Sequence, residues 1–199
     1  MTQSLSSRGL TARTQVFCLT GFMGSGKTTT GALLARQLAW RFVDLDDRIE
    51  AAAGLRIPEI FEQQGELVFR RIEHEQLCAA LGRASEHREP TVLALGGGTY
   101  AQPANLEILR AAGVPIVWLD CPIDLLFARC ATMTGRPLFR DEASFRALHA
   151  ERLPSYQQAE YRVDSAGEPA TVAAAILRLG LAAPANDAHL LVEKHPETR

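Results

Sequence analysis

The chain has 199 residues, of which 47% are hydrophobic and 22% charged, with a formal net charge of −2 at pH 7. This composition is typical of one globular domain with a substantial core, and the charge gives no reason to expect a nucleic acid or an anionic membrane as partner. No apolar run approaches the roughly 20 residues that span a bilayer. The four cysteines form no C-x-x-C pair and are interpreted as free thiols, which favours a cytoplasmic location.

Both ends of the chain lack the periodicity of an ordered element. Residues 1–14 are rich in Ser and Thr and have no apolar core followed by a cleavage site, so we interpret them as a disordered lead-in rather than a signal peptide. Residues 183–199 combine Pro, Asn, Asp and His without a clear period and predict a flexible tail. A single domain is therefore expected over residues 15–182.

The first ordered segment is a phosphate-binding motif in its expected context. Residues 16–20 are a short apolar run, G-F-M-G-S-G-K-T follows at 21–28, and a helical pattern covers 29–39. Strand, glycine loop and helix is the context that supports this motif, in which backbone N–H groups surround phosphate oxygens. Lys27 would reach the β- and γ-phosphates, and the Thr28 hydroxyl would ligate Mg²⁺. The motif therefore predicts a nucleoside triphosphate as ligand.

A second short strand is expected at residues 41–44. Three acids lie at its end: Asp44, Asp46 and Asp47. Ligands collect at the carboxyl ends of strands in open α/β sheets, so acids there are well placed for function. We interpret Asp47 as the cap of the next helix, which ends at Gly54. Asp44 and Asp46 point in different directions, so one could hold a metal-bound water while the other accepts a proton from an acceptor hydroxyl.

Helical patterns dominate the following stretch. A helix is expected over residues 57–81, interrupted at Gly65, and residues 82–90 form a polar connection. Arg70 and Glu73 share one face of this helix, three residues apart. Spacing alone favours a solvated ion pair here over a binding site.

A third strand leads directly into glycine. Residues 91–95 are continuously apolar, as is typical of an inner parallel strand. Gly96, Gly97 and Gly98 follow, and glycines at a strand end allow a ligand to approach the backbone closely. A flexible turn is the alternative, and it is weaker because the strand–glycine junction recurs at the same sheet edge as the phosphate loop.

The rest of the chain continues the alternation. The expected elements are a helix at 103–112, a strand at 115–119, a helix at 123–130, an amphipathic helix at 144–159, a strand at 161–164 and a helix at 170–181. Pro154 should kink or break the helix that contains it. The polar stretch 132–142 contains Gly135 and Arg136 and predicts a mobile lid.

Alternating strands and helices predict an α/β fold, in which five parallel strands have helices on both faces. Phosphoryl transfer needs positioning and charge neutralisation, and the strand ends supply a triphosphate cradle and an acid pair. Arginines suit planar anions through bidentate pairing, and several lie outside these motifs. The residues alone therefore predict a small-molecule kinase whose acceptor carries a hydroxyl and an anionic group.

Together the motifs resemble those of the shikimate kinase family. The resemblance covers residues 17–181 and rests on G-F-M-G-S-G-K-T at 21–28, D-L-D at 44–46, G-E-x-x-F-R-x-x-E at 65–73, G-G-G at 96–98 and R-P-L at 136–138. It implies ATP-dependent phosphorylation of the shikimate 3-hydroxyl, a step of chorismate and aromatic amino-acid synthesis. It also implies a three-layer α/β/α P-loop fold with sheet order 2-3-1-4-5 and a closing lid. The implied cofactor is Mg²⁺ and the implied partners are shikimate and ATP, with a monomer as the default.

The resemblance gives each matching position a role on the acceptor side of the site. Asp46 would bind the acceptor hydroxyls and is the candidate base. Arg70 and Arg152 would grip the shikimate carboxylate, and Glu73 would orient Arg70 and the ring. The glycine run would contact the substrate through its backbone, chiefly at Gly97 and Gly98.

On the nucleotide side, Arg136 would be the lid arginine on the phosphates, and Arg129 would stack on adenine with Pro169 on its other face. Asp44 would sit near Mg²⁺ through water, beside Thr28. The full set expected to bind ATP is Gly24, Ser25, Gly26, Lys27, Thr28, Thr29, Arg129, Arg136 and Pro169. The catalytic set is Lys27, Asp46 and Arg136.

Two alternatives share part of this pattern. A gluconate-type kinase would share the phosphate loop but would not be expected to combine the D-x-D, F-R-x-x-E and G-G-G motifs. A non-catalytic sensor related to shikimate kinases should have lost Lys27, Asp46 or Arg136, or should carry a DNA-binding module. The sequence retains all three residues, and thirteen N-terminal residues cannot form a helix-turn-helix.

Overall fold

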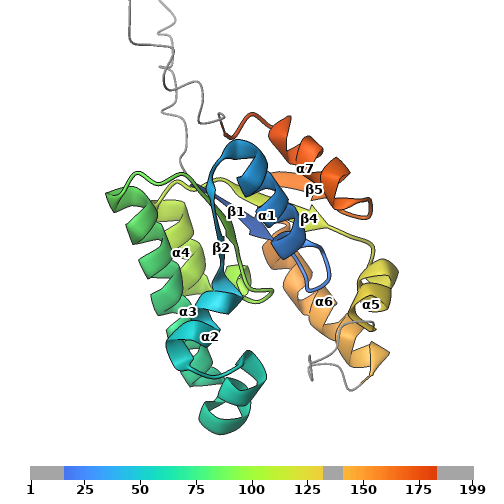
Figure 1. Ribbon diagram of the computed structural model, residues 1–199. Coiled ribbons are helices and arrows are strands. Elements are labelled where there is room, and N and C mark those ends of the chain that lie inside the picture. Colours follow the sequence, from blue (N-terminus) through green and yellow to red (C-terminus); the bar gives the residue numbers. More distant parts are fainter. Residues whose placement is uncertain (1–15, 132–140, 183–199) are drawn as a thin grey trace, which may run out of the picture.

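The computed structural model describes residues 16–131 and 141–182 (Figure 1). The lead-in expected at 1–14, the tail expected at 183–199 and most of the expected lid, including Arg136, lie outside the described residues. Within the described part of the chain, no helix is both long enough and apolar enough to cross a membrane.

A parallel sheet of five strands forms the centre of the molecule. Its strands are β1 (Val16–Thr20), β2 (Arg41–Asp44), β3 (Thr91–Ala94), β4 (Ile116–Asp120) and β5 (Tyr161–Asp164). They are ordered β2-β3-β1-β4-β5, and every neighbouring pair is parallel. This confirms the fold class that the sequence predicts and the strand order that the resemblance to shikimate kinases implies. The order places β1 between β3 and β4, so the segments that follow β1 and β3 emerge side by side.

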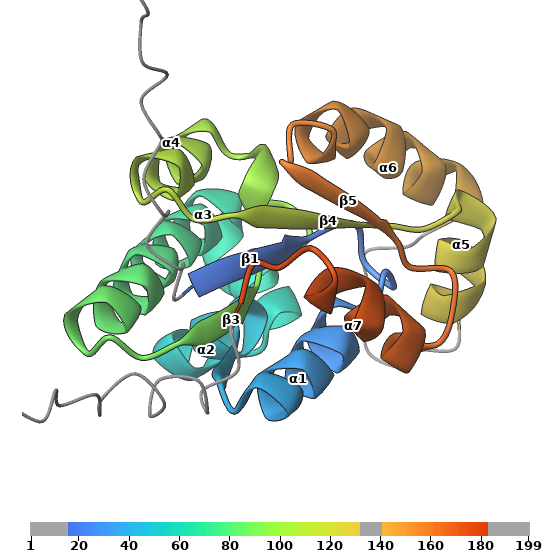
Figure 2. The same cartoon turned by 90° about the horizontal axis from the view of Figure 1, so that it is seen from above.

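Helices cover both faces of the sheet (Figure 2). They are α1 (Lys27–Leu38), α2 (Leu45–Ala53), α3 (Ile57–Glu86), the short η1 (Thr99–Ala101), α4 (Pro103–Ala111), α5 (Ile123–Ala131), α6 (Glu142–Tyr156) and α7 (Pro169–Leu177). Side chains of β1 alternate between two cores, because successive residues of a strand face opposite sides. Phe17 and Leu19 pack with α1 and α7, whereas Cys18 packs in the core that contains residues of α3, α4 and α6.

Three helices differ from expectation, and one of them, α7, ends at Leu177 instead of residue 181. The helix α3 continues to Glu86, through residues interpreted as a polar connection, because Ala84 is buried and extends its core-facing side. Its interruption at Gly65 is confirmed by a φ of 81° and a ψ of 170°. The helix α6 runs through Pro154 without the expected break. Pro154 lies near the C-terminal end of α6, where Tyr156 is fully buried and secures the last turn.

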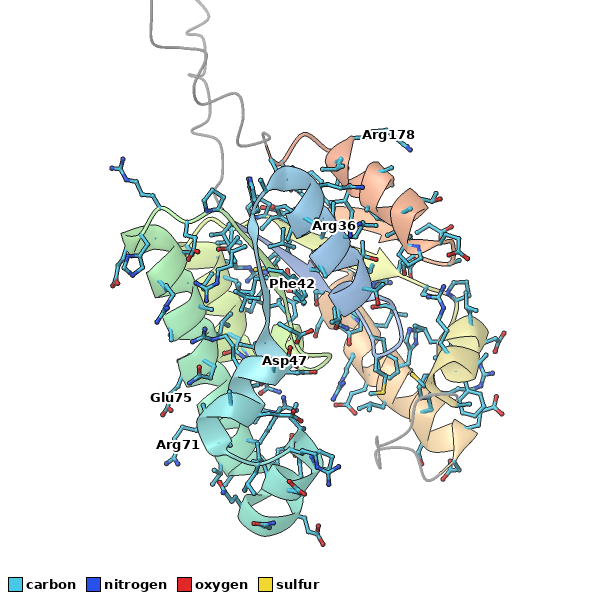
Figure 3. All side chains as sticks on the ribbon, viewed as in Figure 1. Arg36, Phe42, Asp47, Arg71, Glu75 and Arg178 are labelled. Atoms are coloured by element: carbon cyan, nitrogen blue, oxygen red, sulfur yellow. The ribbon has the colours of Figure 1, made fainter. Side chains whose placement is uncertain are left out.

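The cap of α2 is also not the residue expected. Asp44 occupies the N-cap position, and its carboxylate accepts a hydrogen bond from the Asp46 N–H (3.0 Å). Asp47 is exposed in the first turn (Figure 3), where partial desolvation, followed by the neighbouring carboxylates of Asp44 and Glu50, raises its pKa. The interpretation of Asp47 as the cap is therefore wrong, since the last residue of β2 already performs that task.

Candidate active site

The loop between β1 and α1 has the backbone geometry of a phosphate cradle. Gly21, Gly24 and Gly26 adopt φ values of 141°, 79° and 91°, which residues with side chains rarely take. A Cβ on Gly24 would also lie only 2.9 Å from the Cys130 Sγ of α5. Gly26 caps α1 without a side-chain hydrogen bond, so the first turn of the helix presents N–H groups suited to an anion.

Lys27 is the first residue of α1 and bends back over this loop. Its ammonium donates to the carbonyl oxygens of Gly21 (2.7 Å) and Phe22 (3.1 Å). The positive charge is thereby held above the cradle, where phosphate oxygens would be drawn to both the ammonium and the helix N-terminus.

A cavity of about 550 Å³ opens beside the loop. Its lining contains every described residue that was expected to bind the nucleotide: Gly24, Ser25, Gly26, Lys27, Thr28, Thr29, Arg129 and Pro169. Asp44 lines the cavity too, and the Thr28 hydroxyl donates to its carboxylate (2.7 Å). The structure therefore brings the phosphate loop and the end of β2 together around one space large enough for a nucleotide.

Arg129 anchors the opposite wall of this cavity. Its guanidinium donates to the carbonyl oxygens of Gly24 (3.3 Å), Ser165 (3.1 Å) and Ala166 (2.9 Å). These bonds tie α5 to the phosphate loop and to the connection between β5 and α7. Pro169, the first residue of α7, lines the same cavity, so the two residues expected beside adenine lie on one wall.

Asp46 does not line the nucleotide cavity, and its carboxylate lies against the glycine stretch after β3. The position that a Cβ of Gly96 would occupy is 2.7 Å from Asp46 Oδ1, 2.8 Å from Thr99 Oγ1 and 3.4 Å from Glu73 Oε1. Only glycine fits among these oxygens. Asp44 and Asp46 thus face different partners, in agreement with the expectation that acids two residues apart need not share a role.

Glu73 and Arg70 form an inward-facing pair. The Glu73 side chain is 1% exposed and accepts hydrogen bonds from Arg70 Nη1 (2.9 Å) and from the Thr99 hydroxyl (2.7 Å). By contrast, Arg71 and Glu75 on the outer face of α3 are 69% and 60% exposed, and their charged groups are 3.9 Å apart (Figure 3). Arg70 pairs with the exposed Glu66 (3.1 Å) as well as with the buried Glu73, so the pair that spacing predicts is only partly solvated.

Two guanidinium groups converge on Gly98. The position of a Cβ on this residue would lie 3.1 Å from both Nη atoms of Arg70 and 3.2 Å from Arg152 Nη2. The Arg152 guanidinium also stands 5.9 Å from the centre of the Phe22 ring, within cation–π range. Two such planar cations beside one stretch of backbone are suited to a carboxylate ligand.

Sequence reasoning missed two buried hydroxyls in this region. Thr99 holds Glu73 from behind, and Tyr156 donates to the carbonyl oxygen of Gly97. Their positions in the sequence carry a weak signal, since Thr99 directly follows the glycine run and Tyr156 lies one helical turn after Arg152. Neither position suggests a hydroxyl contact until the glycine stretch after β3 is placed next to α6.

A glycine loop that opens a helix at the end of the central strand, with a lysine above it and an acid from the neighbouring segment, defines a P-loop phosphotransferase. A family model described as Shikimate kinase matches residues 23–179. The chain belongs to the shikimate kinase family.

Individual relatives agree with this membership. A shikimate kinase from Synechococcus sp. (strain CC9605) is 45% identical over 166 residues, which cover 81% of this chain and 80% of that protein. A solved shikimate kinase from Acinetobacter baumannii, in complex with shikimate, has a TM-score of 0.76 at 35% identity and covers 88% of this chain and 94% of its own. A solved shikimate kinase from Aquifex aeolicus vf5 has a TM-score of 0.70 at 32% identity, and the match covers 82% of this chain and 94% of that protein.

Proposed function

We propose that the protein transfers the γ-phosphoryl group of ATP to the 3-hydroxyl of shikimate, giving shikimate 3-phosphate and ADP. The observation that carries this proposal is the convergence of Arg70 and Arg152 on Gly98. An acceptor with a carboxylate at that point would lie beside the glycine stretch, which contacts Asp46 at Gly96 and the phosphate loop at Gly97. The Acinetobacter baumannii relative, solved in complex with shikimate, supports the same acceptor.

The acceptor side of the site would bind and activate one hydroxyl group. Arg70 and Arg152 hold the carboxylate through charge-assisted hydrogen bonds, which fixes the ring relative to the backbone at Gly98. Asp46 accepts the proton of the reacting hydroxyl as the new oxygen–phosphorus bond forms. The bond between the γ-phosphorus and the β,γ-bridging oxygen breaks, and its electron pair leaves with ADP.

The nucleotide side would neutralise the charge that develops on the transferred group. The loop N–H groups and Lys27 surround the phosphates, and the wall formed by Arg129 and Pro169 accommodates the adenine. Arg136, outside the described residues, is proposed to add a cation to the phosphates. Preorganised donors of this kind need little rearrangement during the reaction, which is the main way a protein accelerates phosphoryl transfer.

Thr28 and Asp44 fit a magnesium ion. Mg²⁺ prefers hard oxygen ligands and commonly keeps several waters together with phosphate oxygens. The Thr28 hydroxyl and the Asp44 carboxylate supply oxygens 2.7 Å apart at the edge of the nucleotide cavity. When bound, the ion would neutralise the β- and γ-phosphate charge; Thr28 would ligate it directly and Asp44 through water.

An ADP-coupled assay with shikimate, ATP and Mg²⁺ tests the proposal. We expect turnover with shikimate and none with gluconate; the reverse result would reject the assignment. Asp46→Asn should lower kcat by roughly 10² or more, the usual scale for loss of a general base. The matched control is Asp47→Asn, because Asp47 is the exposed neighbour and should leave kcat unchanged. An equal loss of kcat in both variants would show that the effect is not specific to Asp46 and would contradict its role as the base.

The arginine pair has its own test on α6. Arg152→Ala should raise the KM for shikimate while the KM for ATP stays the same, because the proposed ligand contact of Arg152 is with the acceptor carboxylate. Arg146→Ala is the control, since Arg146 lies on the same helix, is 42% exposed and pairs with Glu142 (2.7 Å). An unchanged shikimate KM in Arg152→Ala would mean that this arginine does not bind the acceptor.

We further propose that the protein acts in the cytoplasm as a monomer, organised as a single domain over residues 15–182. Light scattering coupled to size-exclusion chromatography measures the assembly state directly. A mass near the 21.7 kDa of one chain is expected, and a mass near twice that value would contradict the monomer.

A further inference from the structure

Tyr156 joins the end of α6 to the central sheet. It is the last residue of that helix and is fully buried. Its ring stacks on Trp118 of β4, with ring centres 6.3 Å apart and planes inclined by 26°. The ring position is therefore fixed by packing, and the hydroxyl at its tip has little freedom to choose another partner.

The hydroxyl donates to the carbonyl oxygen of Gly97. None of the described peptide bonds is cis, and in a trans peptide the carbonyl and the following N–H point to opposite sides. The Gly97 carbonyl faces the buried tyrosine, so the Gly98 N–H faces away from it. One hydrogen bond thereby sets the direction of the backbone donor at the point where the two guanidiniums converge.

The same hydroxyl also contacts Arg152, which lies four residues earlier and on the same side of α6. Arg152 reaches the glycine stretch as well, since its Nη1 would be 3.4 Å from a Cβ on Gly97. Burial raises the pKa of Tyr156 to about 12. The hydroxyl therefore keeps its proton at neutral pH and remains a donor to Gly97.

We propose that Tyr156 is a positioning residue for the acceptor, whose single buried hydroxyl aligns the Gly97–Gly98 peptide with the Arg152 guanidinium. This proposal rests on the proposed function, because it assigns Tyr156 to the shikimate side of the cleft. Tyr156 itself touches neither substrate. It acts through one backbone donor and one side-chain cation that must face the same ligand.

Tyr156→Phe removes the hydroxyl and keeps the ring against Trp118. We expect the KM for shikimate to rise about ten-fold, the scale of one or two net hydrogen bonds, while kcat and the KM for ATP change less than about two-fold. The control is Tyr100→Phe, another buried tyrosine of the same core, which should leave all three constants unchanged. Replacing Tyr156 with 4-aminophenylalanine, which keeps a donor at the ring tip, should restore the shikimate KM.

Each result has a separate meaning. An unchanged shikimate KM in Tyr156→Phe would overturn the positioning role, and so would an equal rise in the KM of both substrates. Failure of the unchanged protein to phosphorylate shikimate would instead overturn the proposed function. The two outcomes are distinguishable. The positioning role is tested only if the wild-type protein phosphorylates shikimate, whereas the proposed function fails if it does not.

A second measurement avoids substitution and serves if Tyr156→Phe does not fold. Gly97 and Gly98 are the only glycines in the sequence that follow another glycine. Labelling with ¹³C-carbonyl glycine and ¹⁵N-glycine therefore isolates their two amide signals. Adding shikimate should shift the Gly98 amide proton more than that of Gly97. No shift at Gly98 on saturation with shikimate would overturn the proposal.

Discussion

Adjacent residues of the same type have opposite surroundings in this protein. Asp46 abuts the glycine stretch whereas Asp47 is exposed, and Arg70 binds a buried carboxylate whereas Arg71 lies on the outer face of α3. A helix turns by about 100° per residue, so one position decides whether a charge faces the cleft or the solvent. Spacing within the sequence limits the choice of candidates, and packing selects among them.

Thr99 offers a test at the scale of one hydroxyl. It donates to Glu73 Oε1 (2.7 Å) inside the protein, and Thr99→Val would leave that oxygen buried without its donor, which costs about 1–3 kcal/mol. We expect the Glu73–Arg70 pair to shift and the KM for shikimate to rise about ten-fold. Thr99→Ser keeps the hydroxyl donor, so its KM for shikimate should equal that of the wild-type protein. Identical kinetics in the Val and Ser variants would show that the hydroxyl does not hold Arg70.

Tyr156 also predicts a pH dependence of stability. Burial raises its pKa from 10.0 to about 12, so the unfolded chain releases this proton at lower pH than the folded protein. The protonated Tyr156 hydroxyl therefore stabilises the folded protein fully below pH 10, and this stabilisation is lost as the pH rises toward 12. Urea unfolding at about pH 9 and pH 11 should show a smaller stability loss in Tyr156→Phe than in the unchanged protein. Parallel losses would mean that Tyr156 ionises normally.

At the scale of elements, α3 carries both a backbone break and Arg70, which we propose to bind the acceptor carboxylate. Gly65 separates its first turns from the long segment that carries Arg70 and Glu73. The φ of 81° with a ψ of 170° belongs to a region that is essentially limited to glycine. The break lets the long segment take its own direction across the sheet.

Two glycines of this helix should respond in opposite directions to the same substitution. Gly65→Ala forces a side chain into the restricted conformation and should lower stability by about 1–3 kcal/mol. Gly82→Ala lies in regular helix with nothing within 4 Å of the new Cβ, and it should raise stability by about 0.5–1 kcal/mol. Thermal unfolding of both variants measures the difference. A stabilising Gly65→Ala would contradict the backbone geometry.

The five strands were predictable because each is a short segment with strand-forming residues between helical patterns, whereas their order in the sheet came from the resemblance to shikimate kinases. The errors fall where tertiary packing overrides a local signal. Gly82 and the polar residues after it suggest a connection, but burial of Ala84 continues the helix. Pro154 suggests a break, but α6 continues for two more residues, to the buried Tyr156. Glycine in a helix costs only about 1 kcal/mol relative to alanine, and the burial of apolar side chains outweighs a cost of this size.

At the scale of the whole molecule, the sheet register assembles the site. Leu19 of β1 is paired with Ala94 of β3, and Leu95 continues the ladder by donating its N–H to the Leu19 carbonyl (2.9 Å). The phosphate loop and the glycine stretch therefore leave the sheet as neighbours. The sequence motifs identified the ends of these strands, whereas contacts such as Tyr156 to Gly97 span 59 residues and follow only from the assembled fold.

Binding of ATP with Mg²⁺ should stabilise the whole fold, because the nucleotide cavity joins α1, α5 and α7. At about 100 times the dissociation constant the gain is about 2.7 kcal/mol, which corresponds to a rise of about 5–10 °C in Tm. Gly24→Ala should abolish this rise, since its Cβ would lie 2.9 Å from the Cys130 Sγ. Gly82→Ala, remote from the cavity, should keep it.

Persistence of the full ATP-dependent rise in Gly24→Ala would mean that the loop tolerates a side chain there. The measurement is thermal unfolding with and without nucleotide, followed by fluorescence of the two tryptophans.

The closeness of Gly97 to the phosphate loop has a consequence for inhibitor chemistry. A Cβ on Gly97 would lie 3.7 Å from the backbone nitrogen of Met23 and 4.0 Å from the carbonyl oxygen of Gly21. The glycine stretch and the phosphate loop are therefore in contact, so the nucleotide cavity and the proposed acceptor site are adjacent. A single molecule that joins a nucleotide to a carboxylated ring would need only a short linker to occupy both sites. Its affinity would combine both sets of contacts, because the second group binds intramolecularly once the first is bound.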